Sequence, residues 1–216
     1  MANITSEFLA AELEVAERLR AGRSKMLEPQ DLPGRYGRVI RAIDRLLERV
    51  NCGAVVAGGW AVWRHGYLGR VTQDVDIVIP ADRIDELLRV AAVSGFTVLP
   101  ARAGIWPKLL HKESGINVDI LPEGAIPGTS SKPAPTPIPH PARLGAEGSH
   151  LTYIHLCGLI ELKLAAGRTR DESDVIELIR ANANQIDTLR EHLRGVHDHY
   201  GAYFDSLVTR AIEETD

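Results

Sequence analysis

The chain has 216 residues, of which 44% are hydrophobic and 25% are charged, and its formal net charge is −4 at pH 7. These values predict a soluble globular protein of one domain or one and a half that buries a full core, and they exclude a global basic field for nucleic acid while leaving a local basic patch open. No apolar run approaches the roughly 20 residues of a membrane span. The N-terminal residues lack the pattern of a signal peptide, so we expect a cytoplasmic protein that binds no membrane and keeps its two cysteines as free thiols.

Two amphipathic helices are predicted near the N-terminus. Apolar residues recur at helical spacing over residues 6–20 and 35–50. Four arginines line the polar face of the second helix: Arg38, Arg41, Arg45 and Arg49. Acidic residues are interleaved with them, so we expect a solvated face; a contact surface for the phosphates of a nucleic acid is the alternative.

Short apolar runs in the middle of the chain predict strands. Gly, Pro or polar residues bound five of them, at residues 53–57, 74–79, 96–99, 108–112 and 116–121. A helix is expected over residues 82–93, and the last two strands are expected to form a hairpin. This order predicts an α/β (α+β) fold, with a mixed β-sheet core flanked by helices.

The composition changes beyond residue 122. Closely spaced prolines and glycines up to residue 149 predict an extended connector without regular structure. A short strand and four helices are expected after it, at residues 151–154 and at about 156–167, 171–182, 184–194 and 197–213. We therefore divide the chain into a core with N-terminal helices, a Pro/Gly-rich connector and a C-terminal helical region, at residues 1–125, 126–150 and 151–216.

Aspartates interrupt two of the apolar strands. Asp74 and Asp76 are poor strand formers amid valine and isoleucine, and such inconsistencies tend to mark function. Side chains at i and i+2 share a face of a strand, so this pair is expected to project together and to repel unless a cation or a proton relieves it. Asp119 interrupts the last strand in the same way. Three such carboxylates suit two Mg²⁺ ions, or Mn²⁺, in a phosphoryl-transfer site, while a purely structural role is the alternative.

A glycine pair precedes the first of these aspartates. Gly58 and Gly59 close one apolar run and lead into a predicted helix. Glycines let the backbone approach a ligand, and a helix N-terminus offers free N–H groups to phosphates. A plain tight turn is the alternative for the pair alone.

Two further pairs have simpler explanations. Trp60 and Trp63 are expected to anchor the core rather than to stack on bases. Asp171 and Asp174 lie near a predicted helix start, where the helix dipole favours carboxylates, and they are expected to cap that helix.

Together these segments resemble a known family. Gly58-Gly59, a short helix, Arg70-Val71-Thr72-Gln73-Asp74-Val75-Asp76 and a later strand aspartate resemble the nucleotidyltransferase superfamily with the polymerase-beta-like core. The likeness is nearest to the abortive-infection type IV toxin nucleotidyltransferases, with similarity to the aminoglycoside and lincosamide nucleotidyltransferases. It covers residues 53–121 and extends into residues 159–174. It implies Mg²⁺-dependent transfer of a nucleoside monophosphate from a nucleoside triphosphate, such as ATP, to an acceptor hydroxyl.

The resemblance also implies residue roles. Three carboxylates would be catalytic and would bind the metal ions: Asp74, Asp76 and Asp119. Five residues would bind the nucleotide: Gly58, Gly59, Arg70, Thr72 and Lys163. Among them the glycines would hold the β- and γ-phosphates, and Lys163 would reach the triphosphate from the helical region unless it is simply solvated. The nucleotide and the metals are expected in the cleft between the sheet core and that region.

The expected acceptor substrate depends on which branch of the superfamily the chain resembles. A toxin-like enzyme would modify tRNA or a protein and would have an antitoxin as partner. Two alternatives stay open. One is an antibiotic-modifying enzyme with a small acceptor, which would want an acidic pocket for a cationic drug. The other is a non-catalytic antitoxin or regulatory protein that keeps the fold to bind a partner.

Overall fold

A computed structural model of the chain describes residues 6–21, 28–32, 34–100 and 106–213. Its main feature is a mixed sheet of six strands in the order β3-β4-β5-β2-β1-β8. The strands are β1 (Ala54–Ala57), β2 (Val75–Ile79), β3 (Phe96–Val98), β4 (Lys108–His111), β5 (Asn117–Pro122) and β8 (Leu151–Tyr153). Strand β2 runs parallel to β5, and β1 runs parallel to β8, while the other neighbours are antiparallel.

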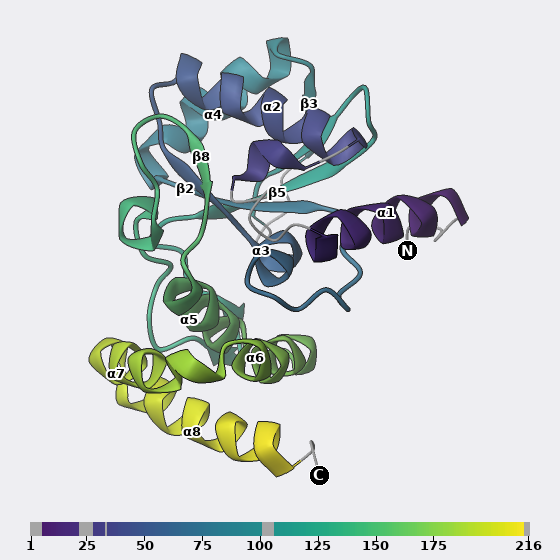
Figure 1. Cartoon of the computed structure of the whole chain (residues 1–216). Coiled ribbons are helices and arrows are strands. Elements are labelled where there is room, and N and C mark those ends of the chain that lie inside the picture. Colours follow the sequence, from purple (N-terminus) through teal and green to yellow (C-terminus); the bar gives the residue numbers. More distant parts are fainter. Residues whose placement is uncertain (1–5, 22–27, 33, 101–105, 214–216) are drawn as a thin grey trace.

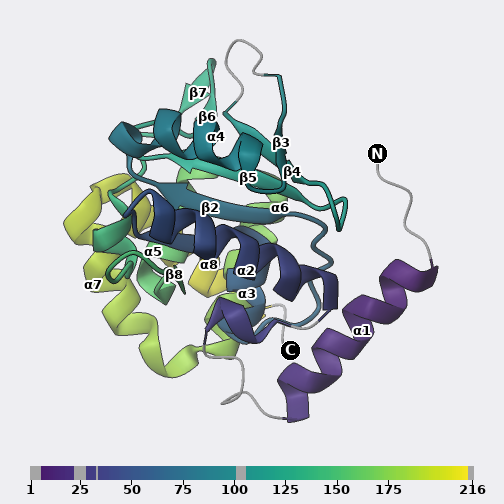
Figure 2. The ribbon, with the colours of Figure 1, turned by 90° about the horizontal axis from the view of Figure 1, so that it is seen from above.

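Helices cover both faces of this sheet (Figure 1). Helices α2 (Gly34–Arg49) and α4 (Ile84–Val93) lie on one face. The C-terminal helices lie on the other: α5 (Leu156–Ala166), α6 (Thr169–Ala181), α7 (Ile186–Val196) and α8 (Asp198–Glu213). The short α3 (Gly58–Arg64) follows β1 directly. Helix α1 (Ser6–Ala21) extends from the side of the molecule, as Figure 2 shows, and joins the core through the buried Val15.

Strand β2 shows how the sequence pattern divides the two faces. Val75, Ile77 and Ile79 belong to the apolar cluster under α2, whereas Val78 belongs to the cluster formed with the C-terminal helices. Because side chains alternate along a strand, Asp76 points to the same side as Val78. The core strand is therefore apolar on both faces except at this one position.

Most predicted elements are confirmed within the described residues. The mixed α/β sheet, the hairpin of β4 and β5, and the four C-terminal helices are present. Trp60 and Trp63 are buried in the core, as expected, and both cysteines are free. The predicted N-terminal helix is present too, although the side chains of Phe8 and Leu19, on which that prediction partly rests, lie outside the described residues.

Two predictions about local structure are wrong. Asp74 lies in a bend before β2 and not inside the strand, so the i, i+2 rule does not apply to the Asp74–Asp76 pair. The Pro/Gly-rich segment contains regular elements: a small hairpin of β6 (Gly128–Thr129) and β7 (Lys132–Pro133), and a 3₁₀ turn over Pro141–Leu144. Its Ile138 and Leu144 are buried against the C-terminal helices, because apolar residues between prolines find a surface to cover.

The remaining elements complete the fold. Short 3₁₀ turns occur at Pro29–Asp31, Ala81–Arg83 and Ala183–Gln185. Strand β8 pairs with β1, so residues that we grouped with the C-terminal region contribute to the main sheet. Among the described helices, none is both long and apolar enough to cross a membrane.

Candidate functional site

A single row of side chains crosses four strands at the centre of the sheet. Asp76 on β2 is the register partner of Asp119 on β5. Ala57 at the end of β1 pairs with Asp76, and Lys108 at the start of β4 pairs with Asp119. Register partners on neighbouring strands share a face, so the two carboxylates face the same space. The adjacency of β2 and β5 in the sheet thus brings Asp119 beside Asp76.

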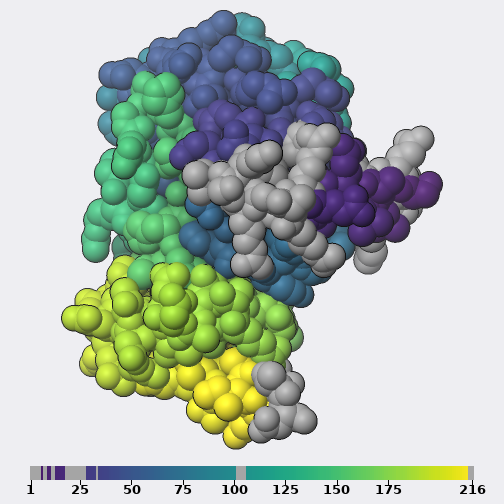
Figure 3. All heavy atoms as spheres, in the orientation of Figure 1, coloured from purple at the N-terminus to yellow at the C-terminus, as the bar shows by residue number. Residues whose placement is uncertain are grey.

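A cavity of about 400 Å³ lies over this row. Its floor contains all four residues of the row. Its opposite wall comes from α5 and the start of α6, and includes Leu159, Leu162, Lys163, Ala166, Arg168 and Asp171. The C-terminal helices pack as one block against the sheet half of the molecule (Figure 3). The cavity thus lies between the sheet and the helical region, where the resemblance predicts the nucleotide.

The glycine pair packs tightly against this floor. Gly58 has a left-handed backbone, with φ of +59°, and a Cβ at this position would overlap the carboxylate of Asp76. A Cβ at Gly59 would overlap the side chain of Thr72. The first glycine also lines the cavity. Both glycines are therefore required by close approach, which brings the backbone at the start of α3 next to the half-buried carboxylate of Asp76.

Asp76 is electrostatically perturbed. Burial, with the nearby charges of Asp74 and Asp119, raises the pKa of Asp76 from 3.8 to about 7. Lys163 and Arg168 oppose this effect without cancelling it. A carboxylate whose charge is disfavoured in this way is stabilised by a proton or by a cation. Its position beside another carboxylate makes it a candidate cation ligand.

Asp119 has one oxygen paired and one left over. Its Oδ2 accepts a hydrogen bond from Nζ of Lys108 at 2.7 Å. Its Oδ1 is buried and has no hydrogen-bond partner. Buried polar atoms of folded proteins nearly always have a partner, and those without a protein partner often bind an ion or a water molecule. The oxygen therefore fits the divalent ion that the resemblance implies.

The carboxylates do not form a complete metal cage. Within the described part of the chain, no three His, Cys, Asp or Glu side chains are grouped as a ready metal site. Asp74 is close enough to raise the pKa of Asp76 but is not among the residues that line the cavity. The structure thus pairs Asp76 with Asp119 and leaves Asp74 at the margin. Oxygen ligands that are supplemented by water and substrate phosphates are nevertheless usual for Mg²⁺.

Lys163 is neither solvated nor free. Its side chain is only 5% exposed, and its Nζ donates to Asp171 at 3.0 Å and to Asp174 at 2.5 Å. The expected capping role of these aspartates is wrong, because α6 has no side-chain cap and both carboxylates are buried. Although burial opposes it, pairing with Arg168 and Lys163 lowers the pKa of Asp171.

Arg70 connects this buried cluster to the sheet half. Its Nε donates to Asp174 at 3.1 Å, and it lines the cavity. Thr72 is buried against Gly59, and its hydroxyl lies 3.5 Å from the carbonyl oxygen of Asp74. Thr72 therefore supports the bend that carries Asp74, whereas Arg70 faces the cavity.

Among the lining residues that sequence reasoning did not predict, Trp106, Lys108 and Arg168 matter most for the chemistry of the cavity. Lys108 has a signal in the sequence, since the hairpin register alone places it opposite Asp119. Arg168 lies in the basic segment before Asp171, and its Nε pairs with that carboxylate at 2.6 Å. Trp106 has no local signal, because it precedes β4 in an irregular stretch.

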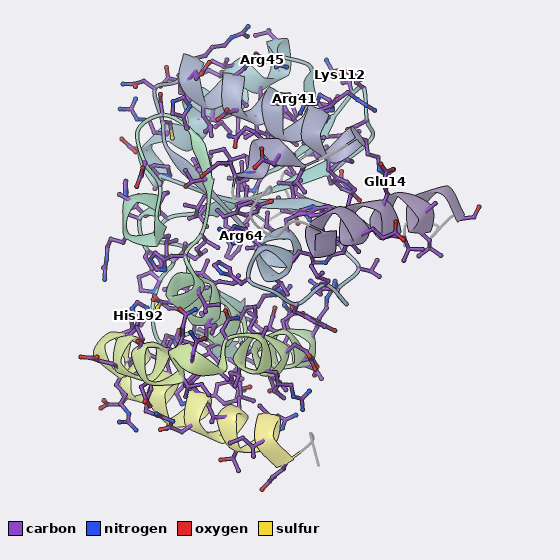
Figure 4. The ribbon with its side chains drawn as sticks, viewed as in Figure 1. Glu14, Arg41, Arg45, Arg64, Lys112 and His192 are labelled. Atoms are coloured by element: carbon purple, nitrogen blue, oxygen red, sulfur yellow. The ribbon has the colours of Figure 1, made fainter. Side chains whose placement is uncertain are left out.

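The arginine stripe lies away from the cavity. The four arginines of α2 are exposed, on the face of the sheet opposite to the C-terminal helices, and Figure 4 labels Arg41 and Arg45 among them. Arg38 pairs with Glu113, and Arg49 donates to Ser94. The stripe is mainly a solvated face, as expected, and it does not border the candidate site.

Solved structures that resemble this chain include two of ANT(2'')-Ia. Its crystal structure in complex with adenylyl-2''-tobramycin is 16% identical, with a TM-score of 0.48, and the match covers 78% of this chain and 96% of that one. The solution structure of antibiotic-resistance factor ANT(2'')-Ia is 14% identical, with a TM-score of 0.43 and coverage of 78% and 98%. Neither a protein-family model nor a curated protein matches the sequence. Both TM-scores are below 0.5, so neither likeness decides the function of this chain.

Proposed function

We propose that the chain is a divalent-metal-dependent nucleotidyltransferase, which moves a nucleoside monophosphate from a nucleoside triphosphate to an acceptor hydroxyl. One observation carries the proposal: Asp76 and Asp119 face each other in register, and the first of them lies directly against the Gly58 backbone. Carboxylates beside a glycine-rich turn combine a cation site with a site for polyphosphate. This combination also agrees with the family resemblance of the sequence.

Each residue of the site has a proposed role. Asp76 and Asp119, with Asp74, would hold Mg²⁺ or Mn²⁺, and the backbone of Gly58 and Gly59 would hold the β- and γ-phosphates. Bound divalent ions would neutralise the triphosphate and favour deprotonation of the attacking hydroxyl. Asp119 would either coordinate an ion or accept the hydroxyl proton, and its unpartnered Oδ1 supports either role.

The cationic side chains have two proposed roles, one in direct contact with phosphate and one in support of the site. Arg70 and Arg168 line the cavity and would neutralise phosphate charge directly. Lys163 is already paired with two aspartates, so we propose that it supports the site by positioning α6 against α5. Most of the rate would come from positioning and charge neutralisation.

We propose a small molecule as the acceptor. The cavity of about 400 Å³ has the size of a small-molecule site. The arginine stripe, which was the one sequence feature in favour of RNA, lies on the other face of the sheet. Among the described residues, we find no feature that supports the tRNA or protein acceptor, or the antitoxin partner, implied by the toxin-like branch.

The test is transfer of label. The chain would be incubated with Mg²⁺ and each of four α-labelled nucleoside triphosphates, with a small-molecule extract, total RNA and cell protein as separate acceptors. We expect label on a small molecule and release of pyrophosphate, both lost in Asp76→Asn. Label on RNA or protein would overturn the small acceptor but keep the transfer reaction. No label and no pyrophosphate would instead favour a non-catalytic binding protein.

A further inference from the structure

The end of the cavity next to β4 differs chemically from the rest. The β4–β5 ladder continues beyond Lys108, because the Ile120 N–H donates to the Pro107 carbonyl at 3.0 Å. The antiparallel register then brings Trp106 opposite Leu121, and both residues line the cavity. An indole, an aliphatic side chain and an ammonium group thus lie together beside Asp119.

The order of the strands indicates which substrate binds at the β4 end of the cavity. This step rests on the proposed function. Across the sheet floor the order is Gly58, Asp76, Asp119 and Lys108. Phosphoryl transfer proceeds in line, with the attacking and leaving oxygens on opposite sides of the phosphorus. If the leaving pyrophosphate is held at the glycine end, the attacking hydroxyl arrives from the end that carries Lys108.

We propose that Trp106 and Lys108 form the acceptor subsite, and that the acceptor is a neutral or anionic molecule with a flat ring system. Aromatic side chains bind flat rings by stacking. Leu121, Pro127 and Ile138 add further apolar surface to the same cavity. Such a surface offers contact area to a ring and no charge to an ammonium group.

The charges of the cavity argue against a polycationic acceptor. Its lining carries four cationic side chains, Arg70, Lys108, Lys163 and Arg168, against three carboxylates, Asp76, Asp119 and Asp171. Two of those carboxylates face the proposed metal site, and the third is paired with Lys163 and Arg168. No surplus negative charge in this lining remains for a polyamine-like ligand. Lys108 is 42% exposed and has three N–H donors, so it can bind an anionic group while it contacts Asp119.

The proposal is tested by binding to the preformed nucleotide complex. The full chain is saturated with Mg²⁺ and α,β-methylene-ATP, and three probes are then titrated by calorimetry: adenosine 5′-monophosphate, adenosine and tobramycin. We expect the monophosphate to bind best, adenosine more weakly, and tobramycin weakest of the three. Tighter binding of tobramycin than of the monophosphate would overturn the proposal.

Substitutions assign the binding to the two residues. Trp106→Ala is expected to weaken both adenine probes by about tenfold, the scale of one stacking contact, while α,β-methylene-ATP still binds. Trp106→Phe keeps a ring and is expected to restore most of the affinity. Lys108→Gln is expected to weaken the monophosphate about threefold to tenfold and adenosine little. Lys112→Gln, on the same hairpin but outside the cavity lining, is the matched control and should change neither probe.

The outcomes separate the two proposals. If α,β-methylene-ATP binds but neither adenine probe does, or if the Trp106 and Lys108 variants bind them like the native chain, the acceptor subsite is wrong and the proposed function stands. If neither α,β-methylene-ATP nor the corresponding analogues of the other three nucleoside triphosphates bind in the presence of Mg²⁺, the proposed function fails and the subsite fails with it.

Discussion

Asp76 and Asp119 lie directly opposite each other on parallel neighbouring strands at the centre of the sheet. Two like charges so placed repel each other, and a fold keeps such an arrangement when a cation relieves it. Lys108 relieves it in part by pairing with Asp119 from the next strand. The charge of Asp119 still contributes to the raised pKa of Asp76, so this relief is incomplete.

Removal of either carboxylate should strongly weaken binding of the proposed metal ion. We expect Asp119→Asn and Asp76→Asn to weaken Mn²⁺ binding by about 100-fold or more, since even outer partners of metal ligands are worth 10- to 100-fold. Both variants should stay folded, because an amide fills the same volume. Mn²⁺ titration followed by electron paramagnetic resonance measures this. Asp82→Asn, at an exposed site, is the control, and undiminished Mn²⁺ binding in Asp119→Asn would contradict the assignment.

The stability of the metal-free protein should depend on pH through Asp76. Its pKa in the folded state is about 7, against the ordinary 3.8, so the folded state binds this proton more tightly than the unfolded chain does. The contribution of Asp76 to the free energy of unfolding therefore falls as pH rises from about 4 to about 7, and is constant above that range. Urea unfolding at several pH values should show this decline in the native chain.

Two comparisons isolate that effect. In Asp76→Asn, the free energy of unfolding should lack the part of the decline with pH that is due to Asp76. This variant should also be more stable than the native chain at pH 8 without metal. Mg²⁺ should stabilise the native chain more at pH 8 than at pH 6, because it competes with the proton for the same carboxylate. A native chain and an Asp76→Asn variant with parallel pH profiles would refute the raised pKa.

Gly58 should tolerate no side chain. Gly58→Ala places an L-residue in a left-handed conformation, which costs roughly 1–2 kcal/mol, and its Cβ also displaces the Asp76 carboxylate. Gly115→Ala is the matched control, since Gly115 has φ of +68° and open space around it. We expect Gly115→Ala to lower the free energy of unfolding only by the cost of the left-handed backbone and to bind Mn²⁺ normally. Equal losses of stability and of Mn²⁺ affinity in the two variants would contradict the close approach of Gly58 to Asp76.

The buried ion-pair cluster should be costly to break. Lys163→Met leaves Asp171 with only Arg168 and Asp174 with only Arg70 as cationic partners, and removal of one partner from a buried ion pair costs up to about 3–5 kcal/mol. Urea unfolding measures this loss, and adding Asp174→Asn to the variant should recover part of it. Lys112→Met, at an exposed position, should stay within about 0.5 kcal/mol of the native chain. A similarly small loss in Lys163→Met would restore the solvated alternative.

The sequence predicts those features that depend on local pattern. The hairpin of β4 and β5 follows from two apolar runs around a glycine turn, and the strand aspartates stand out because they break those runs. The prediction for Asp171 and Asp174 is wrong because a carboxylate near a helix start is usually a cap, whereas these two pair with the side chains of Lys163, Arg168 and Arg70. The contact between Arg70 and Asp174 spans 104 positions, and no local pattern encodes it.

The position of Asp74 is a second feature that local pattern does not determine. Alternation along a strand is a reliable rule only inside the strand, and the exact start of a strand is set by pairing with its neighbours. Here pairing of β2 with β5 begins at Val75. Ile138 and Leu144 belong to a segment that the sequence predicts to lack regular structure. The segment acquires fixed structure because the C-terminal helices offer an apolar surface to these two side chains.

The most direct test of the proposed site is a crystal structure of the chain grown with Mn²⁺ and a non-hydrolysable nucleoside triphosphate, with anomalous scattering recorded from the manganese. We expect an anomalous peak coordinated by the carboxylates of Asp76 and Asp119, with the β- and γ-phosphates against the backbone of Gly58. Manganese bound elsewhere, or a triphosphate bound with no ion between these two aspartates, would contradict the site.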